Sequence, residues 1–178
     1  MTPFAPQDWI LSPTPLDHPD SAALLHAYLD ELISRYYHRP STDAEIKHEL
    51  DHGEDLSGPH GTFLVAWSEG TPVGCVGVRR LSPELTELTK VFVLPQARRG
   101  GAGARIVGAA EDAARSWGAT AMRLNTRKDL TEAIGLYHRL GYREIEPYGD
   151  DPYAELWFEK DLRPPVEEDA GGAGAEDR

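Results

Sequence analysis

The chain has 178 residues and a formal net charge of −12, from 18 Lys and Arg against 30 Asp and Glu. This length suits one domain with a substantial core, and the acidity argues against nucleic acid as a partner. Cys75 is the only cysteine, so neither a disulfide framework nor a cysteine metal site can form within one chain. No apolar run reaches the roughly 18 residues of a membrane span, and the first residues do not resemble a secretory leader. We therefore expect a soluble, cytoplasmic protein with no membrane partner.

The N-terminal third predicts one short strand and two helices. The strand is expected over residues 8–12. A helix from its N-cap Ser21 to about Tyr37 is expected next, because apolar residues recur there at three- and four-residue steps. A second helix is expected to begin at Ser41 or Thr42 and to end near residue 53.

The middle of the chain predicts three consecutive strands. Residues 62–67 and 72–78 are apolar and β-prone, and the turn pair Glu69-Gly70 joins them as a hairpin. A turn around Ser82-Pro83 leads into the third strand, whose sequence ELTKVFVL alternates into apolar residues up to Pro95. These three strands would form an antiparallel meander.

The rest of the chain returns to helices and strands in alternation. In order, we expect a helix ended by Gly118, a strand over 121–126, a helix over about 130–140 closed by Gly141, and strands over 142–145 and 154–160. Asp129 and Glu132 resemble a capping box for the second of these helices. A meander combined with at least one crossover predicts an α/β sheet with helices on both faces. Residues 163–178 are acidic, poor in apolar residues and expected to be disordered, which leaves residues 1–162 as a single domain.

A basic, glycine-rich loop separates the third strand from the following helix. A strand, a loop that exposes its backbone and a helix N-terminus in direct succession suit a bound phosphate. A Walker loop would need Gly-Lys-Ser/Thr, which is absent, and a dinucleotide fingerprint fails because Ile106 stands at its third glycine. Between Arg79 and Arg105, six basic residues face two acidic ones, the reverse of the chain as a whole. A solvated basic turn is the alternative, although such a turn does not need three glycines before a helix.

Two motifs resemble those of one enzyme family. Arg98-x-x-Gly101-x-Gly103 resembles the pyrophosphate-binding loop of the GNAT family of N-acetyltransferases, and residues 133–142, AIGLYHRLGY, resemble its second hallmark. Residues 157–162 resemble its closing strand, so the resemblance covers roughly residues 60–162. It implies the GNAT fold, a mixed, mostly antiparallel sheet of six to seven strands flanked by about four helices. It also implies acetyl-CoA as co-substrate, no metal, and a possible homodimer.

The resemblance further implies where acetyl-CoA binds. The backbone N–H of Val91 would stabilise the oxyanion, and the backbone near Val93 would pair with the pantetheine arm. Many family members have an Asn before the tyrosine helix, but Leu130 stands there in this chain, while Asn125 lies earlier on the strand. The implied cofactor-binding residues are Val91, Phe92, Val93, Arg98, Arg99, Gly100, Gly101, Ala102, Gly103 and Ala104.

Glu87 is the candidate general base. An alkylamine of pKa about 10.4 is mostly protonated at neutral pH and must lose a proton before it can attack a thioester. Glu87 would remove that proton through a water molecule, and it matches by spacing the glutamate of some family members. An exposed strand carboxylate is the alternative. If the strand is regular, Glu87, Thr89, Val91 and Val93 share one face.

Tyr137 is the implied general acid for the departing thiolate. A phenol of pKa about 10 is a plausible proton donor to a thiolate of similar basicity. The alternative is a core aromatic residue that shares a helical face with Ile134 and Leu140. Cys75 is expected to be a small buried hydrophobe rather than a nucleophile. The pair His48 and His52 is expected to be exposed helix polarity rather than a metal site.

The acceptor is predicted less closely than the donor. Four carboxylates could attract a cationic amine: Glu45, Glu49, Asp150 and Asp151. The first expectation is therefore acetyl transfer by direct attack in a ternary complex, with a small cationic amine as acceptor. The alternatives are a protein N-acetyltransferase and a non-catalytic module that binds acyl-CoA as a sensor.

Overall fold

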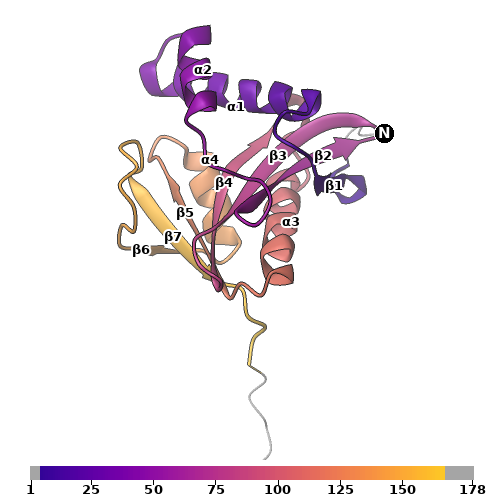
Figure 1. Ribbon diagram of the computed structural model, residues 1–178, viewed down its shortest axis with the longest axis vertical. Coiled ribbons are helices and arrows are strands. Elements are labelled where there is room, and N and C mark those ends of the chain that lie inside the picture. The colour runs from indigo at the N-terminus through magenta and orange to yellow at the C-terminus, as the bar shows by residue number, and fades with distance from the viewer. Residues whose placement is uncertain (1–4, 167–178) are drawn as a thin grey trace, which may run out of the picture.

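A computed structural model describes residues 5–166 of the chain. They form a seven-stranded sheet in the order β1-β2-β3-β4-β5-β7-β6. Every pair of neighbouring strands is antiparallel except β4 and β5, which are parallel. Helices α1 and α2 cover one face of the sheet, and α3 and α4 cover the other (Figure 1). The expected mixed, mostly antiparallel sheet with helices on both faces is confirmed.

All the predicted helices and strands are present. The strands are β1 Ile10–Pro13, β2 Gly61–Ser68, β3 Thr71–Arg80, β4 Leu85–Val93, β5 Ala121–Thr126, β6 Arg143–Ile145 and β7 Leu156–Asp161. The helices are α1 Pro19–Tyr37, α2 Asp43–Asp51, α3 Ala102–Ser116 and α4 Thr131–Arg139, with 3₁₀ turns at Pro6–Asp8 and Pro95–Ala97. No helix among residues 5–166 is both long and apolar enough to cross a membrane. Most of the predicted disordered tail lies outside the described residues.

The beginning of α1 differs from the prediction. The N-cap is His18 rather than Ser21, and its Nδ1 accepts a hydrogen bond from the Asp20 amide at 3.1 Å. Pro19 can open the helix because a first-turn residue needs no amide hydrogen. Ser21 is instead fully buried inside the first turn. The second helix begins as predicted, with Thr42 as its N-cap in a capping box with Glu45.

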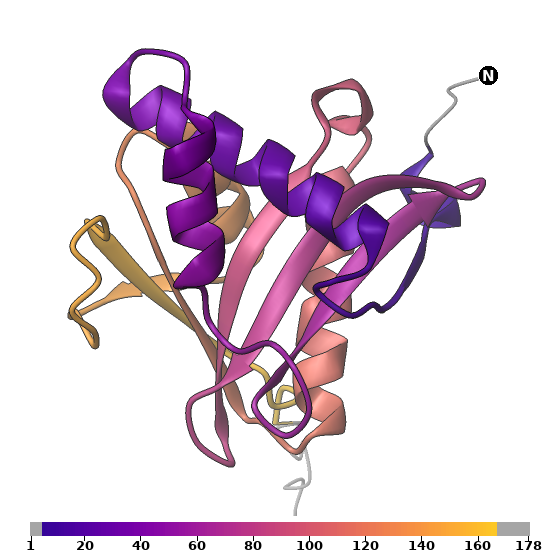
Figure 2. The ribbon, with the colours of Figure 1, turned by 45° about the horizontal axis from the view of Figure 1, so that its top comes forward.

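The two faces of the sheet have separate hydrophobic clusters. On one face, α3 and α4 pack over β3, β4, β5 and β7, and Ile106 lies at the centre of the contact. On the other face, Leu24 and Leu25 of α1 pack against Phe63 and Phe92. Figure 2 shows α1 crossing this face in front of the central strands, with α3 behind them. The two helical layers therefore hold β4 between them.

Ile106 gives a test of the α3 packing. A Cβ built on Gly74 of β3 would lie 2.6 Å from Ile106 Cδ1, so the isoleucine fills the space that this glycine leaves. Ile106 is fully buried, and Ile106→Ala is expected to lower the free energy of unfolding by about 2–5 kcal/mol. Chemical denaturation measures this. The matched control is Ile10→Ala on edge strand β1, where the side chain is 69% exposed and the change should stay within about 0.5 kcal/mol. Equal losses at the two positions would contradict the packing described here.

Strands β4 and β5 pair only at their beginnings. Their register covers Leu85 to Glu87 of β4 against Ala121 to Arg123 of β5. Within the described chain no later residue of β4 pairs with β5, although β4 continues to Val93 and β5 to Thr126. The two strands therefore diverge toward their carboxyl ends, which opens a gap in the sheet where the glycine-rich loop follows β4.

A β-bulge interrupts β4 beside this divergence. Cys75 of β3 pairs with Phe92 and Gly77 pairs with Thr89, so one residue of β3 faces both Lys90 and Val91. Lys90 has a φ of 52°, a left-handed conformation that a bulge accommodates. The extra residue inverts the alternation of side chains, and Val91 and Val93 pack in the α3 cluster with Leu88. The expectation that Glu87, Thr89, Val91 and Val93 share one face is therefore wrong, because the strand is not regular.

Candidate active site

A cavity of about 1020 Å³ extends from the divergence of β4 and β5 to the carboxyl end of α1. Strand β4 contributes residues 87–91 to its lining, and β5 contributes Asn125 and Thr126. Helices α1 and α2 line one side, and the segment between β6 and β7 closes part of the mouth. Glu87 and Tyr137, the two predicted catalytic residues, both line this cavity. The fold thus brings together two side chains that are 50 positions apart in the sequence.

Glu87 is held by two neighbours and is not an exposed strand carboxylate. Only 5% of it is exposed. Arg79 on β3 donates to Oε1 at 2.8 Å, and the hydroxyl of Tyr148 donates to Oε2 at 2.9 Å. The guanidinium of Arg123 lies 5.2 Å from the centre of the Tyr148 ring, a cation–π distance. Each carboxylate oxygen can accept a second hydrogen bond, so the group can still bind a water molecule.

Tyr137 combines a buried ring with a place in the cavity lining. It is 6% exposed, and its ring centre lies 5.8 Å from that of Tyr142 and 6.3 Å from that of Phe158. Burial raises the pKa of the Tyr137 phenol above its ordinary value. The phenol therefore keeps its proton throughout the neutral range. The core-aromatic alternative correctly describes the ring, but the residue also reaches the cavity.

The loop after β4 presents backbone amides at the start of α3. Gly100 and Gly101 have φ of 64° and 86°, values that suit glycine. The first intrahelical hydrogen bond runs from the Arg105 amide to the Gly101 carbonyl at 2.9 Å, so the amides of residues 102–104 have no acceptor within the helix. A Cβ on Gly103 would lie 2.7 Å from Leu136 Cδ2, so this glycine allows α3 to pack against α4.

The predicted cofactor-binding residues lie in three different places. Val91 lines the cavity, whereas the loop residues 98–104 lie outside its lining. Phe92 and Val93 are buried on opposite sides of β4, in the α1 and α3 clusters respectively. Along the chain, the divergence of β4 from β5 comes first, Val91 follows, and the amides at the start of α3 come last. This order suits a long ligand with a phosphate at one end.

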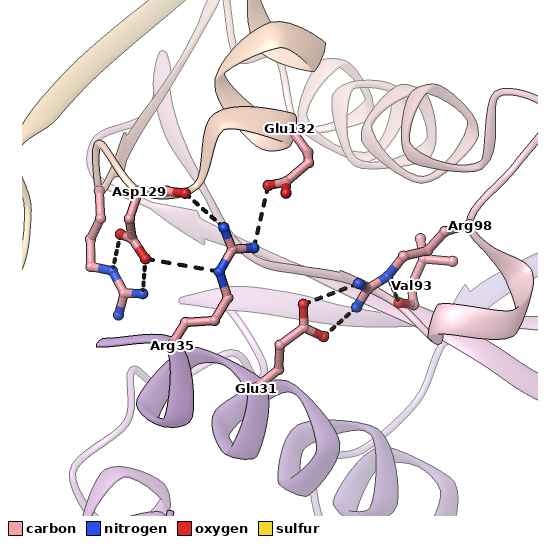
Figure 3. Close-up of polar contacts among 7 residues, drawn as sticks. Glu31, Arg35, Val93, Arg98, Asp129 and Glu132 are labelled. Atoms are coloured by element: carbon pink, nitrogen blue, oxygen red, sulfur yellow. Dashed lines mark hydrogen bonds and ion pairs between the residues drawn. The ribbon is translucent and has the colours of Figure 1, made fainter. Parts of the chain in front are cut away.

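Arg98 is bound by α1 instead of pointing freely from the loop. Its Nε donates to the Val93 carbonyl at 2.7 Å, and its Nη1 donates to Glu31 Oε1 at 3.0 Å. Figure 3 shows its guanidinium between Val93 and Glu31, with Glu31 reaching across from α1. Two predicted cofactor-binding residues, Val93 and Arg98, therefore hydrogen-bond to each other, and a helix from the other face of the sheet holds the second.

Arg35 lies on α1 one turn after Glu31 and joins the helix to the start of α4. It donates to the Asp129 carbonyl at 2.7 Å and to Glu132 Oε2 at 3.3 Å (Figure 3). The predicted capping box of α4 is wrong, because Leu130 is the N-cap and no side chain caps the helix. The Asp129 carboxylate instead accepts two hydrogen bonds from Arg127, both at 2.8 Å. Two arginines thus bind the acidic residues that the sequence pattern assigned to the helix.

The basic stretch from Arg79 to Arg105 carries less uncompensated charge than its sequence suggests. Arg79 pairs with Glu87, Lys90 with Glu54, and Arg98 with Glu31. Glu87 is already counted within the stretch, so Glu54 and Glu31, which lie outside it, neutralise half of the excess of four positive charges. Arg99 is exposed, and within residues 5–166 its side chain has no hydrogen bond or ion pair. The phosphate-binding character of the loop then depends mainly on its amides and on Arg99.

Several cavity residues were missed by sequence reasoning. The partly buried ion pair of Lys90 with Glu54 lines the inner wall, as does Tyr28 of α1. Arg127 is 6% exposed and also donates to the Leu32 carbonyl at 2.9 Å, which fixes α1 to the end of β5. Each of these positions depends on contacts between distant segments, so no local motif could have indicated them. Asn125 and Leu130, which were given no role, both line the cavity.

Other candidate residues behave as the sequence indicated. Cys75 is fully buried, and burial raises the pKa of its thiol to about 12, which is the behaviour of a core residue rather than a nucleophile. His48 and His52 are exposed, with ring centres 4.3 Å apart, and both also line the cavity. Within residues 5–166, no group of three His, Cys, Asp or Glu side chains is arranged to hold a metal ion.

The sequence matches a model of the acetyltransferase (GNAT) family over residues 23–142. An IAA acetyltransferase of Azospirillum brasilense is 36% identical over 148 residues, which cover 80% of this chain and 92% of the relative. An uncharacterised N-acetyltransferase of Schizosaccharomyces pombe is 31% identical over 147 residues, covering 81% of this chain and 87% of the relative.

Solved structures of low sequence identity share the fold. The paiA N-acetyltransferase of Thermoplasma acidophilum, in complex with coenzyme A, has a TM-score of 0.66 at 15% identity and covers 86% of this chain and 98% of that one. A GNAT family acetyltransferase of Elizabethkingia anophelis with acetyl-CoA bound has a TM-score of 0.61 at 15% identity, with the same coverage of 86% and 98%.

Proposed function

The chain belongs to the GNAT family of acetyltransferases, and from this premise we propose that it transfers an acetyl group from acetyl-CoA to the primary amine of a small cationic molecule. The observation that carries this proposal is the cavity at the divergence of β4 and β5, which Glu87, Val91 and Tyr137 all line. A base, a backbone donor and an acid in one cavity are the groups that amine acetylation needs.

The donor half of the reaction would bind along β4. Coenzyme A carries a pyrophosphate at one end and a thioester at the other, and two related folds have been solved with coenzyme A or acetyl-CoA. In this chain the free amides at the start of α3, together with Arg99, suit the phosphates. The gap between β4 and β5 suits the pantetheine arm, and the backbone amide of Val91, which lines the cavity, would bind the thioester carbonyl.

The acetyl transfer would proceed by direct attack with balanced proton movements. Glu87 takes the proton of the ammonium through a water molecule, and the neutral nitrogen forms a bond to the acetyl carbon. The Val91 amide stabilises the oxyanion that develops. As the bond between carbon and sulfur breaks, Tyr137 gives its proton to the sulfur, and the phenolate then recovers a proton from the acylated nitrogen. Arg79 and Tyr148 are positioning residues that hold Glu87.

A panel of primary amines tests the proposed function. The purified protein is mixed with acetyl-CoA and each amine, and free thiol is measured over time. We expect thiol release that depends on the amine and a mass increase of one acetyl group in the product. Acetyl-CoA binding measured by calorimetry, without thiol release for any amine or lysine peptide, would instead identify a non-catalytic acyl-CoA-binding module. Absence of acetyl-CoA binding would overturn the proposal.

Glu31 is expected to weaken acetyl-CoA binding in this enzyme. Its carboxylate binds the guanidinium of Arg98, which would otherwise be available to a phosphate. Since the pair is partly exposed, Glu31→Gln should lower the Kd for acetyl-CoA about 2- to 5-fold. Isothermal titration calorimetry measures the Kd. The control Glu69→Gln removes one charge from the exposed β2–β3 turn and should leave the Kd unchanged. A higher Kd in Glu31→Gln would show that the pair builds the loop instead of competing with the ligand.

A further inference from the structure

Three exposed tyrosines gather at the outer end of the cavity. Tyr36 and Tyr37 end α1, and Tyr153 lies in the segment between β6 and β7; we call these three residues the tyrosine rim. The ring centre of Tyr36 lies 4.9 Å from that of Tyr37 and 5.2 Å from that of Tyr153, both nearly perpendicular. Each residue is 44–46% exposed, and all three line the cavity. Unlike singly exposed apolar side chains, these three rings form a contiguous group on the lining of a cavity, where a ligand could contact them.

The tyrosine rim already binds cations from within the chain. The guanidinium of Arg127 lies 5.1 Å from the Tyr36 ring centre, and that of Arg39 lies 4.8 Å from the Tyr37 ring centre. Both distances fall within the range in which a positive charge is attracted to an aromatic face. Within residues 5–166 no Lys or Arg lies over the ring of Tyr153. A cation brought by a ligand could therefore bind Tyr153 in the same way.

The charges of the cavity are unevenly compensated. At the inner end, Glu54 pairs with Lys90 and Glu87 pairs with Arg79. At the rim, Glu49 and Asp151 have no ion pair within residues 5–166. Glu49 of α2 and Asp151 line the same cavity as Tyr153. The outer end of the cavity is therefore negative, whereas the inner end is nearly neutral.

Helix α1 connects the two ends of the cavity with an apolar wall. Tyr28 contacts Phe92, next to Val91, with ring centres 6.0 Å apart. Tyr36 is eight residues further along, which corresponds to roughly 12 Å at 1.5 Å per residue. The α1 residues that line the cavity between them are Leu29, Leu32 and Ile33. A flexible hydrocarbon chain would fit this wall, because it has no polar group to satisfy there.

We propose that the acceptor is a long aliphatic diamine, one amine of which is acetylated beside Glu87 while the second ammonium binds Tyr153 near Glu49 and Asp151. The placement of the reacting amine beside Glu87 rests on the proposed acetyltransferase function. The site of the second ammonium rests on the rim alone, because the rim supplies aromatic faces, and Glu49 and Asp151 in the same cavity have no ion pair within residues 5–166. The rim residue Tyr36 lies roughly 12 Å along α1 from Tyr28. A diamine as short as diaminobutane would not reach both ends.

Matched amines of equal chain length test the diamine proposal. The ratio of kcat/KM for diaminooctane to kcat/KM for octylamine is measured by thiol release, after correction for the two amines of the diamine. We expect a ratio of about 10 or more, and a smaller ratio for diaminobutane against butylamine. Tyr153→Leu and Glu49→Gln should each reduce the diaminooctane ratio several-fold. Glu69→Gln, which removes a negative charge outside the cavity, should leave the diaminooctane ratio unchanged. This control shows whether the effect of Glu49→Gln arises only from the lower net charge of the chain.

A ligand that cannot be acetylated separates this proposal from the proposed function. Decamethonium carries two quaternary ammonium groups, and its binding is followed by NMR shifts of the tyrosine rings. Binding that is lost in Tyr153→Leu supports the rim as a cation site even if no amine is acetylated. A diamine ratio near one, or a ratio unchanged in Tyr153→Leu, overturns the proposal while leaving amine acetylation intact. Acetylation of lysine peptides in clear preference to every diamine would overturn it as well.

Discussion

Replacement of Tyr137 by phenylalanine is expected to lower kcat about 100-fold while the Kd for acetyl-CoA changes less than about 2-fold. In the proposed mechanism the phenol supplies the proton for the departing thiolate, whereas the buried ring packs against Tyr142 and Phe158. The substitution removes the first contribution and keeps the second. Thiol release under saturating substrates measures kcat, and calorimetry measures Kd.

Tyr28→Phe is the matched control for this experiment. Tyr28 also lines the cavity, and burial, with a smaller contribution from nearby Tyr137, raises the pKa of its phenol. If Tyr137 is the acid, the Tyr28 substitution should lower kcat far less than the Tyr137 substitution. The opposite order would move the acid role to α1, and unchanged turnover in both variants would show that the thiolate leaves without a tyrosine donor.

Glu87→Gln is expected to lower kcat/KM about 100-fold at neutral pH and to change its pH dependence. In the proposed mechanism the wild-type enzyme deprotonates the bound amine through Glu87, so its advantage over the variant is greatest at a pH where the free amine is protonated. As pH rises toward the amine pKa of about 10.4, more of the acceptor is already neutral and the variant should approach the wild type. A pH profile of kcat/KM for both proteins measures the effect. The side chains have the same shape, so the amide can still accept from Arg79 or Tyr148.

Two further observations separate catalysis by Glu87 from a structural role. Tyr148→Phe removes a hydrogen bond to Glu87 but keeps the carboxylate, so it should lower kcat/KM much less than Glu87→Gln. A structural role predicts a different pattern, in which Glu87→Gln lowers the free energy of unfolding and reduces kcat/KM equally at every pH. That pattern would remove Glu87 from the mechanism and leave water as the base.

Local chemistry explains why so many elements could be predicted. Gly118 and Gly141 end their helices with φ of 84° and 89°, a conformation that glycine adopts without strain. Strand β5 begins and ends at the predicted residues, 121 and 126. The beginnings of α1 and α4 were less predictable, because His18 and Leu130 have no strong capping signal. Arg127, which binds the Asp129 carboxylate, is only two positions away, whereas the contact with Arg35 of α1 could not be foreseen from the neighbours of Asp129.

Sequence alone determined the family motifs, the order of the elements and the candidate pair Glu87 and Tyr137. These follow from residues close together in the chain, where periodicity, glycine and helix ends act locally. Only the tertiary structure decided that β4 carries a bulge at Lys90 and separates from β5 after Glu87. It also decided that Glu31 holds Arg98 across 67 positions and that Tyr148 holds Glu87 across 61. Such contacts depend on how distant segments pack, and packing leaves no signal in either segment by itself.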